Sequence, residues 1–350
     1  MNLTNKRIAI TSVITNLTYN DRNHRGLEAV FFRKMMEEKG AQVDVIGCKS
    51  RNVKDFDFYI DFSNTDFSEY EAVMIQLSAA NFFGGQMREH CEKVCNDLAK
   101  YKGKIYMLVN DPKIPPINYA KVINKRFGLC TDSIESWDRI IKEATYLFPG
   151  KDISKFLGWQ PDHWLQVDWF TYIFKHRFAQ DDSIDLLTPT RSDIEKEWDL
   201  VYYGDKRGVF RETQILNYFP KDTNNLLIGY SSDKVPATFI KKLQHSDLTK
   251  KLDRVKVSLI TGDEEHLDNV TTYRFYETLA SNCLAAIQIE YDPEKRLIQD
   301  PVLRDILYVK NQDDVKKLIS MWSSELVDLQ KKELRRIFGQ DFKSQKYRLF

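Results

Sequence analysis

The chain has 350 residues, of which 42% are hydrophobic and 29% charged, with a formal net charge of +1 at pH 7. This length suits two domains, and the balanced charge confines any nucleic-acid site to a local patch. The sequence has no run of about 18 apolar residues and no signal-peptide pattern at its start, so we expect neither a membrane span nor secretion. Five cysteines without CxxC spacing are typical of reduced cytosolic thiols.

The first 46 residues predict a βαβ unit. Residues 7–13 form a predicted buried strand, 27–39 a helix ended by Gly40, and 42–46 a second strand. This order predicts a parallel sheet with right-handed crossovers. The loop before the helix lacks a GxGxxG pattern, which argues against a dinucleotide fingerprint. Glu28 lies in the first helical turn and is a candidate cleft carboxylate; the alternative is ordinary favourable placement at a helix N-terminus.

Two further strands are predicted at 70–77 and 104–109. Asp111 follows the second of these, at the expected carboxyl edge of the sheet, and Pro112 keeps the next segment from continuing as a helix. A carboxylate in this place is a candidate general base, although it could also be a turn residue before a proline.

The middle of the chain, from 121 to 191, is rich in basic and aromatic residues. We interpret its tryptophans as core residues, which is their commoner role, and we assign no strand there. The polar stretch 181–197 is the predicted interdomain linker.

A second α/β unit begins with the predicted strand 199–203, which ends at Gly204. Arg207 and Arg211 then stand four residues apart at the start of a predicted helix. Two guanidiniums at a helix N-terminus suit a diphosphate, and the alternative is two solvated arginines. Residues 226–229 predict the next strand, and 236–244 predict a helix.

The stretch 257–292 predicts a strand, an acidic loop, a helix capped by Asn269 or Thr271, and a second strand at 284–289. Arg274 and Glu277 share one face of that helix. The loop and first helical turn of such a unit lie where ligands usually bind, although this spacing also fits a surface ion pair. A last helix is predicted at 324–338 and carries the basic cluster Lys331, Lys332, Arg335 and Arg336.

Several blocks are distinctive: RIAI at 7–10, NFFGG at 81–85, YKGKIYMLVND at 101–111, YGDKRGVFRE at 203–212 and ITGDEEHLDNVTTYRFYETLAS at 260–281. Through them the chain resembles the DNA β-glucosyltransferases of T-even bacteriophages, nearly end to end. The resemblance implies an α/β fold of two Rossmann-like domains facing each other across a cleft, the GT-B arrangement. The expected domains are 1–190, which carries the catalytic base and lies on the DNA side, 191–320, which binds the UDP-sugar, and 321–350, a helical tail packing back across the domains.

The resemblance also implies roles for single residues. Asp111 matches the catalytic base, and Glu28 the acid that touches the donor sugar. The donor residues are Arg207, Arg211 and Arg274 on the diphosphate, Glu277 on the ribose hydroxyls, and Gly229, which leaves room for the nucleotide. Three arginines would neutralise the leaving diphosphate. Mg²⁺ or Mn²⁺ could assist product release, but the sequence shows no His/Cys cluster to hold one, and no metal ligand is predicted.

The implied acceptor is 5-hydroxymethylcytosine in double-stranded DNA, flipped out of the base stack, in the cytoplasm of an infected bacterium. The enzyme is expected to be a monomer. Candidate phosphate contacts are Lys121, Lys125, Arg126, Lys331 and Arg335, each of which could instead be a solvated surface charge.

The segments 23–25 and 114–118 depart from the family pattern. They leave open a different donor, such as UDP-arabinose, or an acceptor base that is already glucosylated. Two further alternatives are a transferase acting on a small molecule or lipid, and a DNA-binding protein without catalysis.

Overall fold

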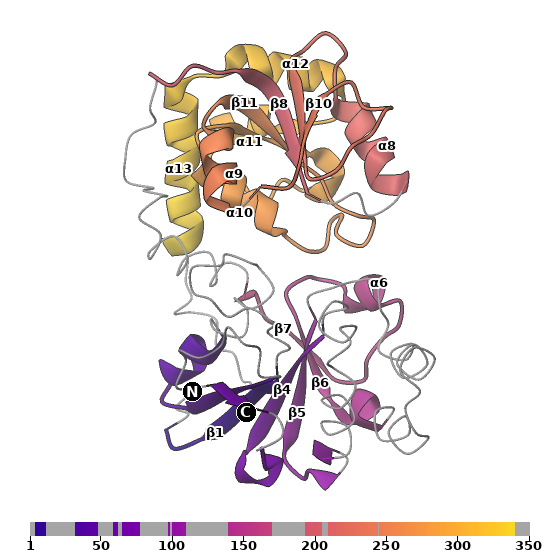
Figure 1. Ribbon diagram of the computed structural model, residues 1–350, viewed down its shortest axis with the longest axis vertical. Coiled ribbons are helices and arrows are strands. Elements are labelled where there is room, and N and C mark those ends of the chain that lie inside the picture. Colours follow the sequence, from indigo (N-terminus) through magenta and orange to yellow (C-terminus); the bar gives the residue numbers. More distant parts are fainter. Residues whose placement is uncertain are drawn as a thin grey trace. The chain divides into compact units, whose positions relative to one another are not determined.

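The computed structural model describes residues 4–11, 32–47, 59–61, 65–77, 97–98, 100–109, 139–169, 193–204, 209–243 and 245–339. The chain divides into two compact units (Figure 1), Met1–Trp169 with Lys346–Phe350, and Phe170–Gln345. Each unit is built on its own parallel sheet.

The described part of the first unit holds a seven-stranded sheet in the order β3-β2-β1-β4-β5-β6-β7, with every pairing parallel. Its strands are β1 (Arg7–Thr11), β2 (Gln42–Gly47), β3 (Tyr59–Asp61), β4 (Ala72–Leu77), β5 (Lys104–Val109), β6 (Thr145–Phe148) and β7 (Trp164–Gln166). The strands predicted near 7, 42, 70 and 104 are confirmed. Residues 32–37 are helical, and Gly40 adopts the predicted left-handed conformation with φ of 93°.

The strands β6 and β7 and the short helix α6 (Ile153–Leu157) were not predicted from the sequence. These strands have three or four residues, too few to show a reliable alternation. The prediction that tryptophans of this region belong to the core is supported for two of them. Trp169 is buried and packs edge-on against Phe32, and Trp159 packs against Tyr146. A short 3₁₀ helix, η2 (Phe67–Glu69), precedes β4.

The described part of the second unit holds a six-stranded parallel sheet in the order β10-β9-β8-β11-β12-β13. Its strands are β8 (Trp198–Tyr203), β9 (Asn225–Ile228), β10 (Thr238–Ile240), β11 (Val255–Ile260), β12 (Leu284–Gln288) and β13 (Tyr308–Val309). Within the unit this is the doubly wound order 3-2-1-4-5-6, which reverses between β8 and β11. Ligands of such sheets bind beyond the carboxyl ends of the strands at the reversal.

The prediction of a helix at 236–244 is wrong. Residues 238–240 form the edge strand β10, which pairs in parallel with β9, and the helix α9 (His245–Leu252) begins later. Thr238, Phe239 and Ile240 are β-branched or aromatic, and pairing with β9 satisfies their backbone in an extended form. The predicted cap of the helix after β11 is also wrong, because α10 (Tyr273–Ala280) begins after Thr272.

Helices cover both faces of the second sheet (Figure 1). The helix α8 (Val209–Tyr218) packs with α12 (Gln312–Met321), whereas α10 packs against β11, β12 and α13 (Ser324–Gly339). The described part of this unit also contains α11 (Pro301–Leu307) and the 3₁₀ helix η3 (Ile289–Tyr291). The predicted last helix is confirmed, and its described part belongs to the second unit.

Residues at the end of the predicted linker are attached to the second unit. The Lys196 ammonium donates to the carbonyls of Asp253 and Asn282 at 2.6 and 2.7 Å and lies 4.5 Å from the centre of the Trp322 ring. These contacts tie the entry into β8 to the segments that enter β11 and β12.

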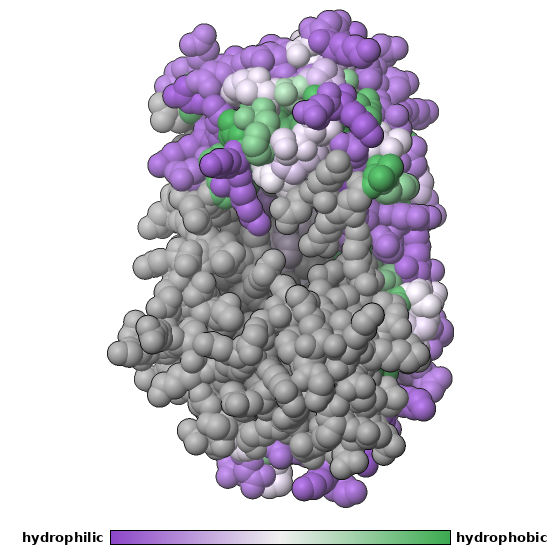
Figure 2. Space-filling view, turned by 45° about the vertical axis from the view of Figure 1, so that its right-hand side comes forward, coloured by the Kyte–Doolittle hydropathy of each residue, from purple (hydrophilic) through white to green (hydrophobic). Residues whose placement is uncertain are grey.

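The described helices are all too short or too polar to cross a membrane. Figure 2 shows a mainly hydrophilic surface on the coloured part of the second unit, with separate hydrophobic spots. Among the described residues of this unit, the exposed large hydrophobic ones are Val209, Phe210, Phe239 and Val302.

Candidate functional site

Two glycines shape the backbone where β8 and β9 end. Gly204 has φ of 137° and Gly229 has φ of 104°, a region that favours glycine. A Cβ on Gly229 would lie 2.9 Å from the Gly204 carbonyl oxygen, and a Cβ on Gly204 would lie 2.5 Å from Arg274 Nη2. The two turns therefore approach each other, and the Arg274 side chain, more closely than any larger residue would permit.

Arg274, in the first turn of α10, bridges the strand reversal. Its Nε donates to the Tyr203 carbonyl at 2.8 Å, and its Nη1 donates to the Thr261 carbonyl at 2.9 Å. Tyr203 ends β8 and Thr261 follows β11, so the guanidinium joins the carboxyl ends of the two strands between which the order reverses. This geometry differs from a surface ion pair and places a fixed cation where ligands of this fold bind.

Tyrosines surround this guanidinium. Its Nη2 donates to the Tyr202 hydroxyl at 3.2 Å, and its central carbon lies 4.4 and 5.3 Å from the ring centres of Tyr202 and Tyr203. Burial acts to lower the pKa of Arg274, but the neighbouring tyrosine oxygens and the carboxylate of Glu277 together outweigh it and raise that pKa. Described residues engage three of its five N–H groups, which leaves donors for an anionic ligand.

Glu277 lies one helical turn beyond Arg274 and is only 7% exposed. Burial raises the pKa of Tyr203, and the nearby negative charge of Glu277 raises it further. Arg274 and Glu277 thus lie in one interior neighbourhood. Their spacing had predicted a shared helix face, but not its burial.

Arg211 extends the site from α8. It is 6% exposed, and its Nη2 lies 2.8 Å from Oδ2 of the buried Asp263, in the loop after β11. A buried cation needs such a partner. Asp263 was not among the predicted site residues, and its only sequence signal was the acidic GDEEH stretch.

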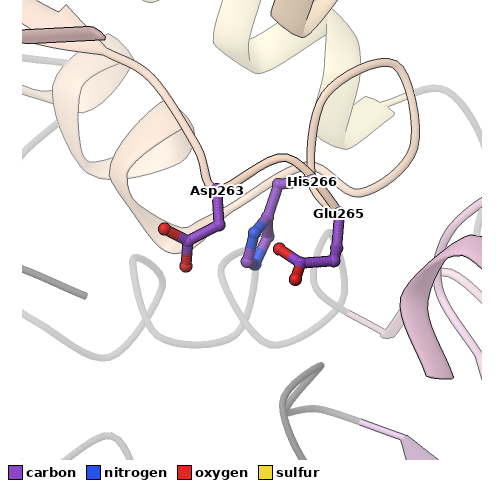
Figure 3. Close-up of side chains that lie close together, drawn as sticks. All are labelled: Asp263, Glu265 and His266. Atoms are coloured by element: carbon purple, nitrogen blue, oxygen red, sulfur yellow. The ribbon is translucent and has the colours of Figure 1, made fainter. Parts of the chain in front are cut away.

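Asp263, Glu265 and His266 also form a group that could hold a metal ion, because one ligand atom from each lies within 4.8 Å of the others. Figure 3 shows the imidazole between the two carboxylates. The chain turns tightly here, since a Cβ on Gly262 would lie 2.6 Å from the His266 Cβ. Two carboxylates and an imidazole suit Mn²⁺ or a similar divalent cation, so these residues fit a metal whose ligands the sequence had not predicted.

Of the other predicted site residues, some lie in the described part of the chain and some lie outside it. Arg335 is exposed on α13, whereas Lys331 is 6% exposed and donates to Asn282 Oδ1 at 2.6 Å. Burial corrects the prediction for Lys331, whose ammonium is unavailable to a DNA backbone. The predicted residues outside the described part of the chain are Glu28, Asp111, Lys121, Lys125, Arg126 and Arg207.

Comparisons with known proteins cover both units. Residues 6–142 match the family model of bacteriophage T4 beta-glucosyltransferase. The chain is 27% identical over 310 residues to the DNA beta-glucosyltransferase of Enterobacteria phage T4, and the match covers 84% of each chain.

Two solved structures match nearly the whole chain. One is T4 phage BGT in complex with UDP and Mn²⁺, with 24% identity, a TM-score of 0.72 and coverage of 95% of this chain and 94% of that one. The other is an alpha-glucosyltransferase in complex with UDP and a 13-mer DNA containing a HMU base, with 10% identity, a TM-score of 0.51 and coverage of 96% and 95%. The predicted GT-B fold class is thereby confirmed.

Proposed function

Because the chain resembles the bacteriophage T4 β-glucosyltransferase family across both units, we propose that this glycosyltransferase moves glucose from UDP-glucose to 5-hydroxymethylcytosine in duplex DNA. The observation that carries the proposal is Arg274, which bridges the strand reversal of the second sheet. Buried Arg211 supplies a second guanidinium from α8, where it pairs with Asp263 in the loop after β11. A nucleoside diphosphate is the donor group that such paired guanidiniums recognise.

The donor would bind at the carboxyl edge of the second sheet. Its diphosphate would take the unused N–H groups of Arg274 and contact Arg211 and Arg207, while Glu277 would accept hydrogen bonds from the ribose hydroxyls. Gly229 would contribute through its backbone, because its missing side chain lets the end of β9 approach the turn at Gly204.

The chemistry proposed for the first unit depends on Asp111, two residues after the end of β5. Asp111 would accept the proton of the hydroxymethyl group as the oxygen attacks C1 of the sugar and the bond from C1 to the diphosphate oxygen breaks. Attack from the face opposite the leaving UDP inverts the anomeric centre, and the arginines stabilise the charge that develops on UDP. Glu28 would orient the donor sugar.

The acceptor base has to leave the duplex to meet this carboxylate, which implies base flipping. Exposed Arg335, with Lys121, Lys125 and Arg126, would contact DNA phosphates. The proposed setting is the cytoplasm of an infected bacterium, where a monomer would modify phage DNA and protect it from host restriction.

A divalent cation such as Mn²⁺ fits Asp263, Glu265 and His266. When bound, it would supply positive charge that favours departure of the UDP product.

The test is mass spectrometry of nucleosides from hydroxymethylcytosine-containing duplex DNA incubated with the protein and separate UDP-sugars. We expect a hexose mass from UDP-glucose, and no product from an Asp111→Ala variant that still binds UDP and DNA. A pentose mass only from UDP-arabinose would change the donor, and addition only to glucosylated DNA would change the acceptor. Tight DNA binding without transfer from any donor would favour a non-catalytic DNA-binding protein.

A further inference from the structure

The Tyr230 hydroxyl is a buried polar group without a described partner. Tyr230 directly follows Gly229 and is 8% exposed, and its hydroxyl oxygen makes no hydrogen bond to a described residue. Buried hydroxyls in native proteins are nearly always bonded to protein, water or ligand. This one lies one residue beyond a glycine that the donor site requires, so a bound ligand is a natural partner.

The surroundings of Tyr230 are those of the candidate site. Its ring packs edge-on against Tyr202, with ring centres 6.0 Å apart and planes at 76°. The Tyr202 hydroxyl in turn accepts from Arg274 Nη2 at 3.2 Å. Tyr230 therefore extends the Arg274 and Tyr202 cluster toward the end of β9.

The charges around Tyr230 indicate which class of ligand would form a hydrogen bond with its hydroxyl. Burial raises the pKa of its hydroxyl, whereas the positive charges of Arg211 and Arg274 act to lower it. The negative charge of Glu212 is also near, but that carboxylate accepts from the Ser232 hydroxyl at 2.5 Å. A hydroxyl that stays protonated beside two guanidiniums can donate to an anionic oxygen, which the guanidiniums attract.

We propose that the Tyr230 hydroxyl donates a hydrogen bond to a phosphate oxygen of the nucleoside diphosphate held by Arg211 and Arg274. This inference rests on the proposed function and adds a ligand contact from the turn after β9 to those from α8 and α10. The diphosphate would thus be held from three separate segments of the second unit.

The experiment compares the wild-type protein with Tyr230→Phe by calorimetric titration with UDP and by thermal unfolding without ligand. We expect the Kd for UDP to rise about tenfold, as for loss of a hydrogen bond to a charged group. The ligand-free Tm should not fall, since phenylalanine keeps the ring and removes only an unbonded oxygen.

The matched control is Tyr218→Phe, because the Tyr218 hydroxyl donates to Glu290 Oε2 at 3.1 Å on the same unit. It should lower the Tm and leave the Kd for UDP unchanged. An unchanged Kd in Tyr230→Phe, or a lower ligand-free Tm, would overturn the inference. Failure of the wild-type protein to bind UDP would overturn the proposed function itself and the inference with it.

Discussion

Asp263, in the loop after β11, takes part in two charged groups. Asp263 pairs with Arg211 and also stands with Glu265 and His266 in a group fit for a metal ion. One carboxylate thus links a cation of the protein to a possible bound cation. An anion held by Arg211 would therefore lie next to the metal group.

At this scale we predict that the protein binds Mn²⁺ without nucleotide, detected as loss of the free-ion signal in electron paramagnetic resonance. Glu265→Gln should weaken this binding at least about tenfold, because it removes a charged ligand. The control is Glu264→Gln, which removes the same charge from an exposed neighbour outside the group and should leave the binding curve unchanged. Equal weakening in both variants would mean a diffuse charge effect without a defined site.

Residue spacing in the sequence identified some residues of the candidate site and missed others. Arg211, Arg274 and Glu277 stood out because local spacing places them in the first turns of helices that follow strands. His266 was missed although Asp263 and Glu265 stand close to it in the sequence, because no His/Cys cluster marked the stretch. Tyr230 gave no local signal, since its neighbours come from other segments, such as Tyr202 on β8 and, through Tyr202, Arg274 on α10. Only tertiary structure brings those partners together.

At the scale of elements, the helix α10 is held at its end by one buried residue of α13. The Gln330 amide donates to the Cys283 carbonyl at 2.9 Å and to the Thr278 carbonyl at 3.3 Å, and its oxygen accepts from the Ala285 backbone N–H at 2.9 Å. These bonds satisfy backbone groups between α10 and β12 that no water can reach. Gln330 therefore fixes the helix that carries Arg274 and Glu277.

Gln330→Leu should lower the free energy of unfolding by roughly 2–4 kcal/mol, because it keeps the volume but leaves buried backbone groups unbonded. Urea unfolding followed by circular dichroism would measure the change. The control is Lys332→Leu, an exposed position of the same helix, which should change stability by less than about 0.5 kcal/mol. A loss below about 1 kcal/mol in Gln330→Leu would show that the backbone groups find other partners.

Element prediction succeeded where apolar runs were long and bounded by clear turns, as at β5 and β11. It failed at β10, where a three-residue edge strand takes its conformation from pairing with β9. Local propensity in such a segment is too weak to decide between helix and strand.

At the scale of the whole molecule, two sheets with separate cores carry different parts of the proposed reaction. The described donor residues all belong to the second unit, whereas the proposed base follows β5 of the first. The repeated strand and helix pattern predicted two α/β units from sequence alone. The GT-B arrangement came from the family resemblance, because no sequence period specifies how two such units combine.

This division predicts which backbone amides UDP protects from hydrogen exchange. UDP should slow exchange most in the backbone amides around 203–204, 229–230 and 261–277, because a ligand suppresses local opening where it binds. The amides of β1 and β4 in the first sheet should change much less. Mass spectrometry of peptides with and without UDP would show the pattern, and a predominant effect on the first sheet would place the nucleotide in the wrong unit.

The carbonyls that hold Arg274 belong to the main chain, so every residue type at 203 and 261 supplies them. Mutations accumulating at these positions during evolution cannot delete the acceptors, provided that the two strands persist. Substitutions at positions 203 and 261 therefore leave the acceptors of the Arg274 guanidinium in place. Sequence divergence as large as that between this chain and a relative 27% identical over 310 residues can therefore leave the anchoring of Arg274 intact.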